Sequence, residues 1–225
     1  MQKKRIYIIA AAVIAGLIGI YVGIEVYRKH RIEKLRLIDK EKRHRVLTDL
    51  HGFLMKFANE TGTEPFLMYG TLLGQQRENN LICWDYDLDY GIHKDEYAKL
   101  REAIAKEIKS YPQYKLTSSA FEDLIGAKQL KIEDIETGLN LDVSSMVVEG
   151  TESVRRDYPR ILLRYYFKEA NTDFPYKAVF PLTPVSFLGV LSYIPAYPPA
   201  MLKSWYGEKY MTPDRTCACE ACAKK

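Results

Sequence analysis

The stretch YGTLLG at 69–74, followed by WDYDLDY at 84–90, decides the fold predicted for this chain. Three aspartates in the second segment, Asp85, Asp87 and Asp89, alternate with apolar and aromatic residues. Alternation is typical of a β-strand, in which every second side chain lies on the same face. We therefore expect a strand that presents all three carboxylates on one face.

Like charges on one face repel each other and destabilise the fold unless a cation lies among them. The aromatic and apolar neighbours of these aspartates argue against a solvated acidic face. Carboxylate oxygens suit Mg²⁺ (or Mn²⁺), which takes one or two carboxylates plus substrate phosphates. The pattern thus predicts a metal site that includes Asp85, Asp87 and Asp89. A tight turn beside a calcium-stabilised loop is the alternative interpretation.

The glycine-bearing segment predicts a phosphate site next to this strand. Gly70 allows close approach of the backbone, and Thr71 offers a hydroxyl group. A turn of this kind at the start of a helix binds phosphate through backbone N–H groups.

A third carboxylate, Asp142, lies in the apolar segment Leu139–Val143. An unpaired carboxylate in an apolar strand is costly. A neighbouring strand would place Asp142 beside the first aspartates, as a metal ligand or general base. A salt-bridged strand end is the alternative, and Asp134 and Glu136 compete for the role from a predicted turn.

The remaining patterns alternate between helix and strand, which predicts the α+β (α/β) class with a mixed sheet flanked by helices. Gly62 is expected to end the first helix. The expected helices are 32–58, 94–109 and 198–206, with a helical turn at 72–77. The expected strands are 66–69, 87–92, 128–135 and 139–148. A hairpin is expected over 184–195, turning at 188–189.

The positive charge of the chain is concentrated at one end. The net charge is +4, but residues 1–45 carry +8 and residues 46–225 carry −4. A nucleic-acid-binding domain needs a basic patch on the folded domain itself, so we expect no nucleic-acid partner.

Residues 6–24 form an uncharged, mostly apolar run that would span roughly 28 Å as a helix, close to the thickness of a bilayer core. Basic residues flank it on both sides, and the excess on the C-terminal side favours a cytoplasmic catalytic domain. We therefore expect a single-pass N-terminal transmembrane helix, with the bilayer as a partner. A cleaved signal peptide and a buried core helix are the alternatives.

The expected organisation is a basic N-terminus (1–5), an anchor (6–27), a basic stalk (28–45), a catalytic domain (46–214) and a cysteine-rich tail (215–225).

Three of the four cysteines, Cys217, Cys219 and Cys222, lie in that tail. Their spacing suits Zn²⁺ or Cu⁺, or a disulfide in an oxidising lumen. A disordered, reactive tail is the interpretation that we favour.

These motifs together resemble the nucleotidyltransferase superfamily and, within it, the LicD/fukutin-related family. That family reads Tyr-Gly-Thr-Leu-Leu-Gly, then an arginine, then a hydrophobic-Pro-Trp-Asp-x-Asp-hydrophobic-Asp run. The matching residues here are 69–74, Arg77 and 82–89, with Cys83 where the family usually has proline. Asp142 matches the later Asp-hydrophobic strand, and residues 187–213 match the closing Phe-x-Gly, Tyr-Gly and Pro pattern. The resemblance covers about residues 46–214.

The resemblance implies transfer of a phosphorylated small alcohol, such as phosphocholine or a polyol phosphate, from a CDP-linked donor to a glycan hydroxyl. A nucleotidyltransferase that releases pyrophosphate, or a non-catalytic membrane-anchored adaptor, are the alternatives. The location would be the Golgi or ER membrane in a eukaryote, or the plasma membrane in a bacterium. The implied metal ligands are Asp85, Asp87, Asp89 and Asp142, the implied catalytic residues are Asp87, Asp89 and Asp142, and the implied substrate-binding residues are Gly70, Thr71, Gly74, Arg77 and Lys131.

Overall fold

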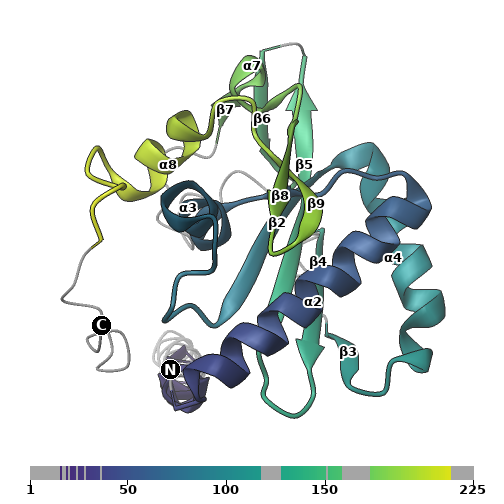
Figure 1. Cartoon of the computed structure of the whole chain (residues 1–225), viewed down its shortest axis with the longest axis vertical. Helices are drawn as coiled ribbons and strands as arrows, with labels where there is room; N and C mark the ends of the chain where they lie inside the picture. Colours follow the sequence, from purple (N-terminus) through teal and green to yellow (C-terminus); the bar gives the residue numbers. More distant parts are fainter. Residues whose placement is uncertain are drawn as a thin grey trace, which may run out of the picture. The chain divides into compact units, whose positions relative to one another are not determined.

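The computed structural model describes residues 16, 19, 21–23, 25–27, 29–35, 37–117, 128–150, 152–158 and 173–213 (Figure 1). The chain divides into two compact units, Met1–Asp39 and Lys40–Lys225. Most of the predicted membrane span lies outside the described residues, and so do the three tail cysteines. Within the described part, no helix has both the length and the apolar character needed to cross a bilayer.

The second unit is built on one mixed sheet. Nine strands of the described residues form it, in the order β3-β4-β5-β2-β1-β9-β8, with β6 paired to β5 and β7 paired to β6. β2 runs parallel to β5, and β1 runs parallel to β9; the other pairs are antiparallel. The strands are β1 (Phe66–Leu67), β2 (Asp87–His93), β3 (Tyr114–Thr117), β4 (Gln129–Asp134), β5 (Asn140–Glu149), β6 (Ser153–Arg156), β7 (Phe174–Pro175), β8 (Thr183–Phe187) and β9 (Val190–Ile194).

Helices cover both faces of this sheet, which confirms the predicted mixed sheet flanked by helices. Helices α2 and α4 pack on one face, and α3 and α8 lie on the other (Figure 1). The helices are α2 (Lys40–Thr61), α3 (Tyr69–Glu78), α4 (Lys94–Glu107), the 3₁₀-helix η1 (Ile108–Ser110), α7 (Tyr176–Val179) and α8 (Pro198–Tyr206).

The period of β2 separates an apolar face from an acidic one. Leu88, Tyr90 and Ile92 are buried on the side of α2, where the hydroxyl of Tyr90 lies 2.7 Å from Nδ1 of His51. Side chains of a strand alternate between its two faces. Asp87 and Asp89 therefore lie on the opposite face, towards α3.

Several boundaries follow the sequence predictions. Gly62 has a φ of +61° directly after α2, and the β8–β9 hairpin turns at Leu188 and Gly189, with φ values of +49° and +80°. The helix predicted from residue 32 differs at its start, because a turn at residues 37–38 separates α2 from the helical residues before it. Asp39 stands directly before α2, a position where aspartate is favoured.

Short strands account for most of what the patterns did not predict. β3 and β6 have four residues each, and β7 has two. Such segments are too short to show a clear alternation, and only pairing with neighbouring strands specifies them.

Candidate functional site

Two parallel strands bring the predicted carboxylates together. Asp89 of β2 lies directly opposite Asp142 of β5, and Asp87 lies opposite Asn140. Residues paired in this way in a parallel ladder project to the same face of the sheet. The predicted placement of Asp142 beside the first aspartates is therefore confirmed.

Asp85 reaches this group in a different way from the one predicted. β2 begins at Asp87, so Asp85 lies in the loop before the strand, and the prediction that it shares the strand was wrong. The pairing of β2 with β5 starts only at Asp87, opposite Asn140, so Asp85 lies before the paired part of the chain, which alternation alone does not reveal. The carboxylate of Asp85 packs against Gly70, where a Cβ atom would lie 2.5 Å from Oδ2 of Asp85.

The carboxylates interact strongly with one another. Burial, followed by the charge of Asp87, raises the pKa of Asp85, and the guanidinium of Arg43 acts in the opposite direction. Burial, followed by the charges of Asp87 and Asp142, raises the pKa of Asp89. A cation bound among these side chains would relieve their repulsion.

The donor set fits a divalent cation that takes few protein ligands. Among the described residues, no three His, Cys, Asp or Glu side chains converge closely enough to form a complete metal cage. Mg²⁺ does not require such a cage, because it usually binds one or two carboxylates and completes its octahedron with water and phosphate oxygens. Asp87 and Asp89 on β2, with Asp142 beside them, could supply those carboxylates.

The start of α3 is bonded to the strand that carries these aspartates. The backbone N–H of Asp89 donates to the Thr71 hydroxyl at 2.8 Å, and the N–H of Met68 donates to the Asp89 carbonyl at 2.9 Å. Thr71 is buried, and Tyr69 adopts a φ of +44°. The first turn of α3, which contains Gly70, therefore begins beside the carboxylates.

Gly74 lies one turn further along α3 and packs against the loop that follows the helix. A Cβ atom there would lie 2.4 Å from the backbone oxygen of Asn80 and 3.1 Å from the backbone nitrogen of Ile82. This contact gives a packing reason for a glycine at this position.

Arg77 contacts the segment after α8. Its guanidinium donates to the carbonyl oxygens of Tyr210 and Thr212, the second at 3.3 Å. Arg77 thus holds residues 210–212 against α3.

Lys131 of β4 forms an ion pair with Asp142. Its ammonium group is 3.0 Å and 3.1 Å from the two carboxylate oxygens of Asp142. The third carboxylate is therefore both ion-paired and adjacent to Asp89, which combines the two interpretations of Asp142 made from the sequence.

Two buried arginines belong to the site without any sequence signal that singles them out. Arg43 of α2 is 3% exposed, and its charge lowers the pKa of Asp85, against the larger effect of burial. Arg156 of β6 lowers the pKa of Asp89, against the larger effect of burial, and donates to the Ser144 hydroxyl at 2.9 Å. Arginines in a charged helix and in a four-residue strand look like solvated surface residues, so only the tertiary structure identifies them.

Aromatic side chains of α8 complete the site. The ring of Trp205 lies against the ring of Tyr69, with 4.1 Å between their centroids. Partial burial, followed by the charges of Asp89, Asp85 and Asp87, raises the pKa of Tyr206, although the residue is 44% exposed. Its hydroxyl therefore stays protonated beside the carboxylates and can donate a hydrogen bond there. The sequence motif Trp205-Tyr206-Gly207 was the available signal for this helix.

Cys83, which replaces the expected proline, is disulfide-bonded. It lies two residues before Asp85, in the loop that carries the first carboxylate.

Comparisons with solved structures find distant matches. The lincosamide antibiotic adenylyltransferase LnuA bound to lincomycin matches with a TM-score of 0.46 and 9% identity, over 72% of this chain and 94% of that chain. ANT(2″)-Ia in complex with adenylyl-2″-tobramycin matches with a TM-score of 0.44 and 8% identity, over 78% of this chain and 83% of that chain. A search of curated proteins finds no match.

The family comparison is specific. The family model described as "LicD/FKTN/FKRP, nucleotidyltransferase domain" matches residues 62–197. This range is more than half of the chain and contains the turn at Gly70, the aspartates of β2 and Asp142. The protein therefore belongs to the LicD/fukutin-related family of transferases.

Proposed function

We propose that this protein transfers a phosphorylated small alcohol from a CDP-linked donor to a glycan hydroxyl, in a reaction that depends on Mg²⁺ or Mn²⁺. The observation that carries the proposal is the pairing of Asp89 with Asp142, directly beside the buried hydroxyl of Thr71. This arrangement places the cluster of aspartates next to the start of a helix, where backbone N–H groups favour binding of an anion such as phosphate. Membership of the family supports the same class of chemistry.

The chain's own residues divide into two groups in this proposal. Asp87 and Asp89, with Asp85 and Asp142 close by, would hold the divalent ion. When bound, that ion neutralises charge on the diphosphate of the donor. The first turn of α3, at Gly70 and Thr71, would bind the distal phosphate through backbone N–H groups.

The transfer step is a displacement at the distal phosphorus. The oxygen of the acceptor hydroxyl forms a bond to that phosphorus while the bond to the bridging oxygen breaks, and CMP leaves with that electron pair. A carboxylate of the group, Asp89 or Asp142, accepts the hydroxyl proton. Lys131 places a positive charge beside Asp142, and the Tyr206 hydroxyl can donate a hydrogen bond to the substrate.

The predicted anchor over residues 6–27 would hold the catalytic unit at a membrane surface. A glycan acceptor carried on a lipid or on a cell-surface polymer would then be within reach of the site. This part of the proposal rests on the uncharged run of residues 6–24 and its basic flanks.

A donor screen tests the function. The full-length protein is incubated with CDP-choline, CDP-ribitol, CTP or ATP in the presence of Mg²⁺, and released CMP and pyrophosphate are quantified by chromatography. We expect CMP from a CDP-alcohol and no pyrophosphate. Pyrophosphate from CTP or ATP, without turnover of any CDP-alcohol, would instead establish a nucleotidyltransferase. Asp87→Asn serves as the inactive control for both readouts.

A further inference from the structure

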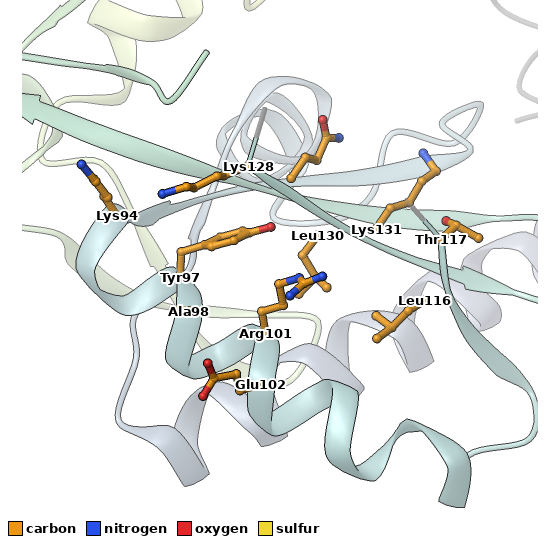
Figure 2. Close-up of a pocket in the computed structure, with 11 residues that line it drawn as sticks. Lys94, Tyr97, Ala98, Arg101, Glu102, Leu116, Thr117, Lys128, Leu130 and Lys131 are labelled. Atoms are coloured by element: carbon orange, nitrogen blue, oxygen red, sulfur yellow. The ribbon is translucent and has the colours of Figure 1, made fainter. Parts of the chain in front are cut away.

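A cleft of about 390 Å³ lies between α4 and β4 (Figure 2). α4 contributes Lys94, Tyr97 and Arg101 to its lining, and β4 contributes Lys131. Lys128, directly before β4, lines the cleft as well. Its volume is in the range of sites for small molecules. None of the carboxylates of the candidate active site lines it.

The lining of this cleft carries a net positive charge. Four cationic side chains face a single carboxylate, that of Glu102. Two of the cations are already engaged, because Lys131 is bonded to Asp142 and Lys128 lies 3.7 Å from Asp157. Within the described part of the chain, Lys94 and Arg101 are in no ion pair. A concave surface with one sign of charge concentrates ligands of the opposite sign.

The two unengaged cations lie on the same face of α4. Lys94, Ala98 and Arg101 follow the spacing i, i+4, i+7, which places them in a row along the helix. Figure 2 shows Tyr97, Arg101 and Lys128 around the middle of the cleft, with Lys94 at one end of it. The planar guanidinium of arginine matches the geometry of phosphate oxygens.

The cleft also offers neutral contacts for the rest of a ligand. The Thr117 hydroxyl is buried and has no hydrogen-bond partner among the described residues. A buried hydroxyl without a partner is costly and is usually satisfied by water or a ligand. Leu116 and Leu130 add apolar surface next to it.

We propose that this cleft binds a small phosphorylated ligand, a phosphomonoester on a sugar or polyol, with its phosphate on Lys94 and Arg101. The site is separate from the carboxylate group, and the proposal does not depend on the reaction catalysed there. Lys131 connects the two regions, because its side chain lines the cleft while its ammonium group lies on Asp142.

The test is calorimetric titration of the full-length protein with glucose 6-phosphate at low ionic strength. Replacing Arg101 with Gln, or Lys94 with Gln, should weaken binding roughly tenfold, since each change removes a charge-assisted hydrogen bond. Lys99→Gln is the matched control, because Lys99 is exposed on the same helix but does not line the cleft. Its affinity should equal that of the wild type.

Two results would overturn the proposal. One is no binding of glucose 6-phosphate to the wild type, and the other is an equal loss of affinity in Lys99→Gln, which would indicate diffuse attraction to a basic surface. Both cleft variants alter exposed side chains, so circular dichroism should show an unchanged fold. A second titration, with the same phosphate at the end of an oligosaccharide, distinguishes a free sugar phosphate from a phosphorylated glycan as the source. Tighter binding of the oligosaccharide would support the glycan.

Discussion

The backbone N–H of Asp89 donates a 2.8 Å hydrogen bond to the hydroxyl of Thr71. The bond joins the first turn of α3 to the strand that presents the carboxylates. The Asp89 carbonyl in turn accepts from the N–H of Met68, so the backbone of Asp89 is held on both sides by the start of α3. The geometry between the proposed phosphate-binding turn and the proposed metal ligands therefore depends on one backbone hydrogen bond and on the buried hydroxyl of Thr71.

Replacing Thr71 with Val keeps the shape of this side chain but removes the acceptor. We expect the free energy of unfolding to fall by about 1–3 kcal/mol, because the Asp89 N–H is left buried and unpaired. Urea titration followed by circular dichroism measures this change. Thr71→Ser keeps the oxygen and should retain turnover, whereas Thr71→Val should lose most of it. Equal stability of the Val and Ser variants would show that the hydrogen bond has no structural role.

Two glycines of the motif respond differently to an added methyl group. Gly74→Ala places Cβ 2.4 Å from a backbone oxygen of Asn80, which cannot move without the whole loop. Gly70→Ala places Cβ 2.5 Å from Oδ2 of Asp85, a side-chain atom that can rotate away. We expect the larger loss of stability, about 1–3 kcal/mol, for Gly74→Ala, since overpacking against a rigid neighbour has this cost. Gly70→Ala should mainly lower turnover, because it displaces Asp85.

Gly52→Ala in α2 is the control for both glycine variants. Nothing lies within 4 Å of a Cβ atom at Gly52, and the residue is in the interior of a helix. Alanine there should stabilise the protein by up to about 1 kcal/mol, because glycine is the poorer helix former. Thermal unfolding of the three variants gives the order of their stabilities. A Gly74→Ala variant as stable as Gly52→Ala would contradict the packing argument.

The sequence was sufficient to predict the part of the site that lies in regular elements. Alternation placed Asp87 and Asp89 on a strand, and the cost of a carboxylate in an apolar segment identified Asp142. Alternation could not show that pairing with β5 starts only at Asp87, which leaves Asp85 in the loop before the strand. The partners of a carboxylate are also beyond a local pattern, since Arg43 comes from a helix more than 40 positions earlier in the chain.

Asp87 is the proposed ligand whose replacement gives the clearest loss of function. Asp87→Asn removes one charge from a group of mutually repelling carboxylates, so the fold should remain and stability should not fall. We expect CMP release to be abolished, as the donor diphosphate loses its metal. Asp95→Asn, an exposed change on α4, should keep wild-type activity. Wild-type turnover by Asp87→Asn would remove this aspartate from the mechanism.

Tyr206 tests the role of α8 in the same site. Tyr206→Phe removes only the hydroxyl that lies near the three aspartates, and it leaves the stacking of Trp205 on Tyr69 unchanged. We expect kcat/KM to fall roughly tenfold, the effect of losing one hydrogen bond to the transition state. The matched control is Tyr197→Phe, since Tyr197 is exposed and precedes the same helix. Equal kinetics of the two variants would assign Tyr206 to packing alone.

His51 should make stability depend on pH. Burial lowers the pKa of His51 to about 4, although a hydrogen bond to the Phe187 carbonyl raises it slightly. The neutral ring fits its partners, because Nε2–H can donate to that carbonyl at 3.2 Å while Nδ1 accepts from the Tyr90 hydroxyl at 2.7 Å. The unfolded chain binds a proton at this residue near pH 6.5, but the folded chain does so only near pH 4. The stabilisation by neutral His51 is therefore complete above about pH 6.5 and is lost as the pH falls towards 4.

The loss over this interval is about 3 kcal/mol, from a shift of this size. His51→Gln keeps polar contacts in the core but cannot take up a proton, so its own baseline stability should be lower and its pH profile flatter. Urea titrations of both proteins between pH 4 and 7 give the difference, and the contributions of carboxylates and of exposed histidines cancel in the comparison. Parallel profiles for the two proteins would show that His51 is protonated in the folded state as readily as in the unfolded chain.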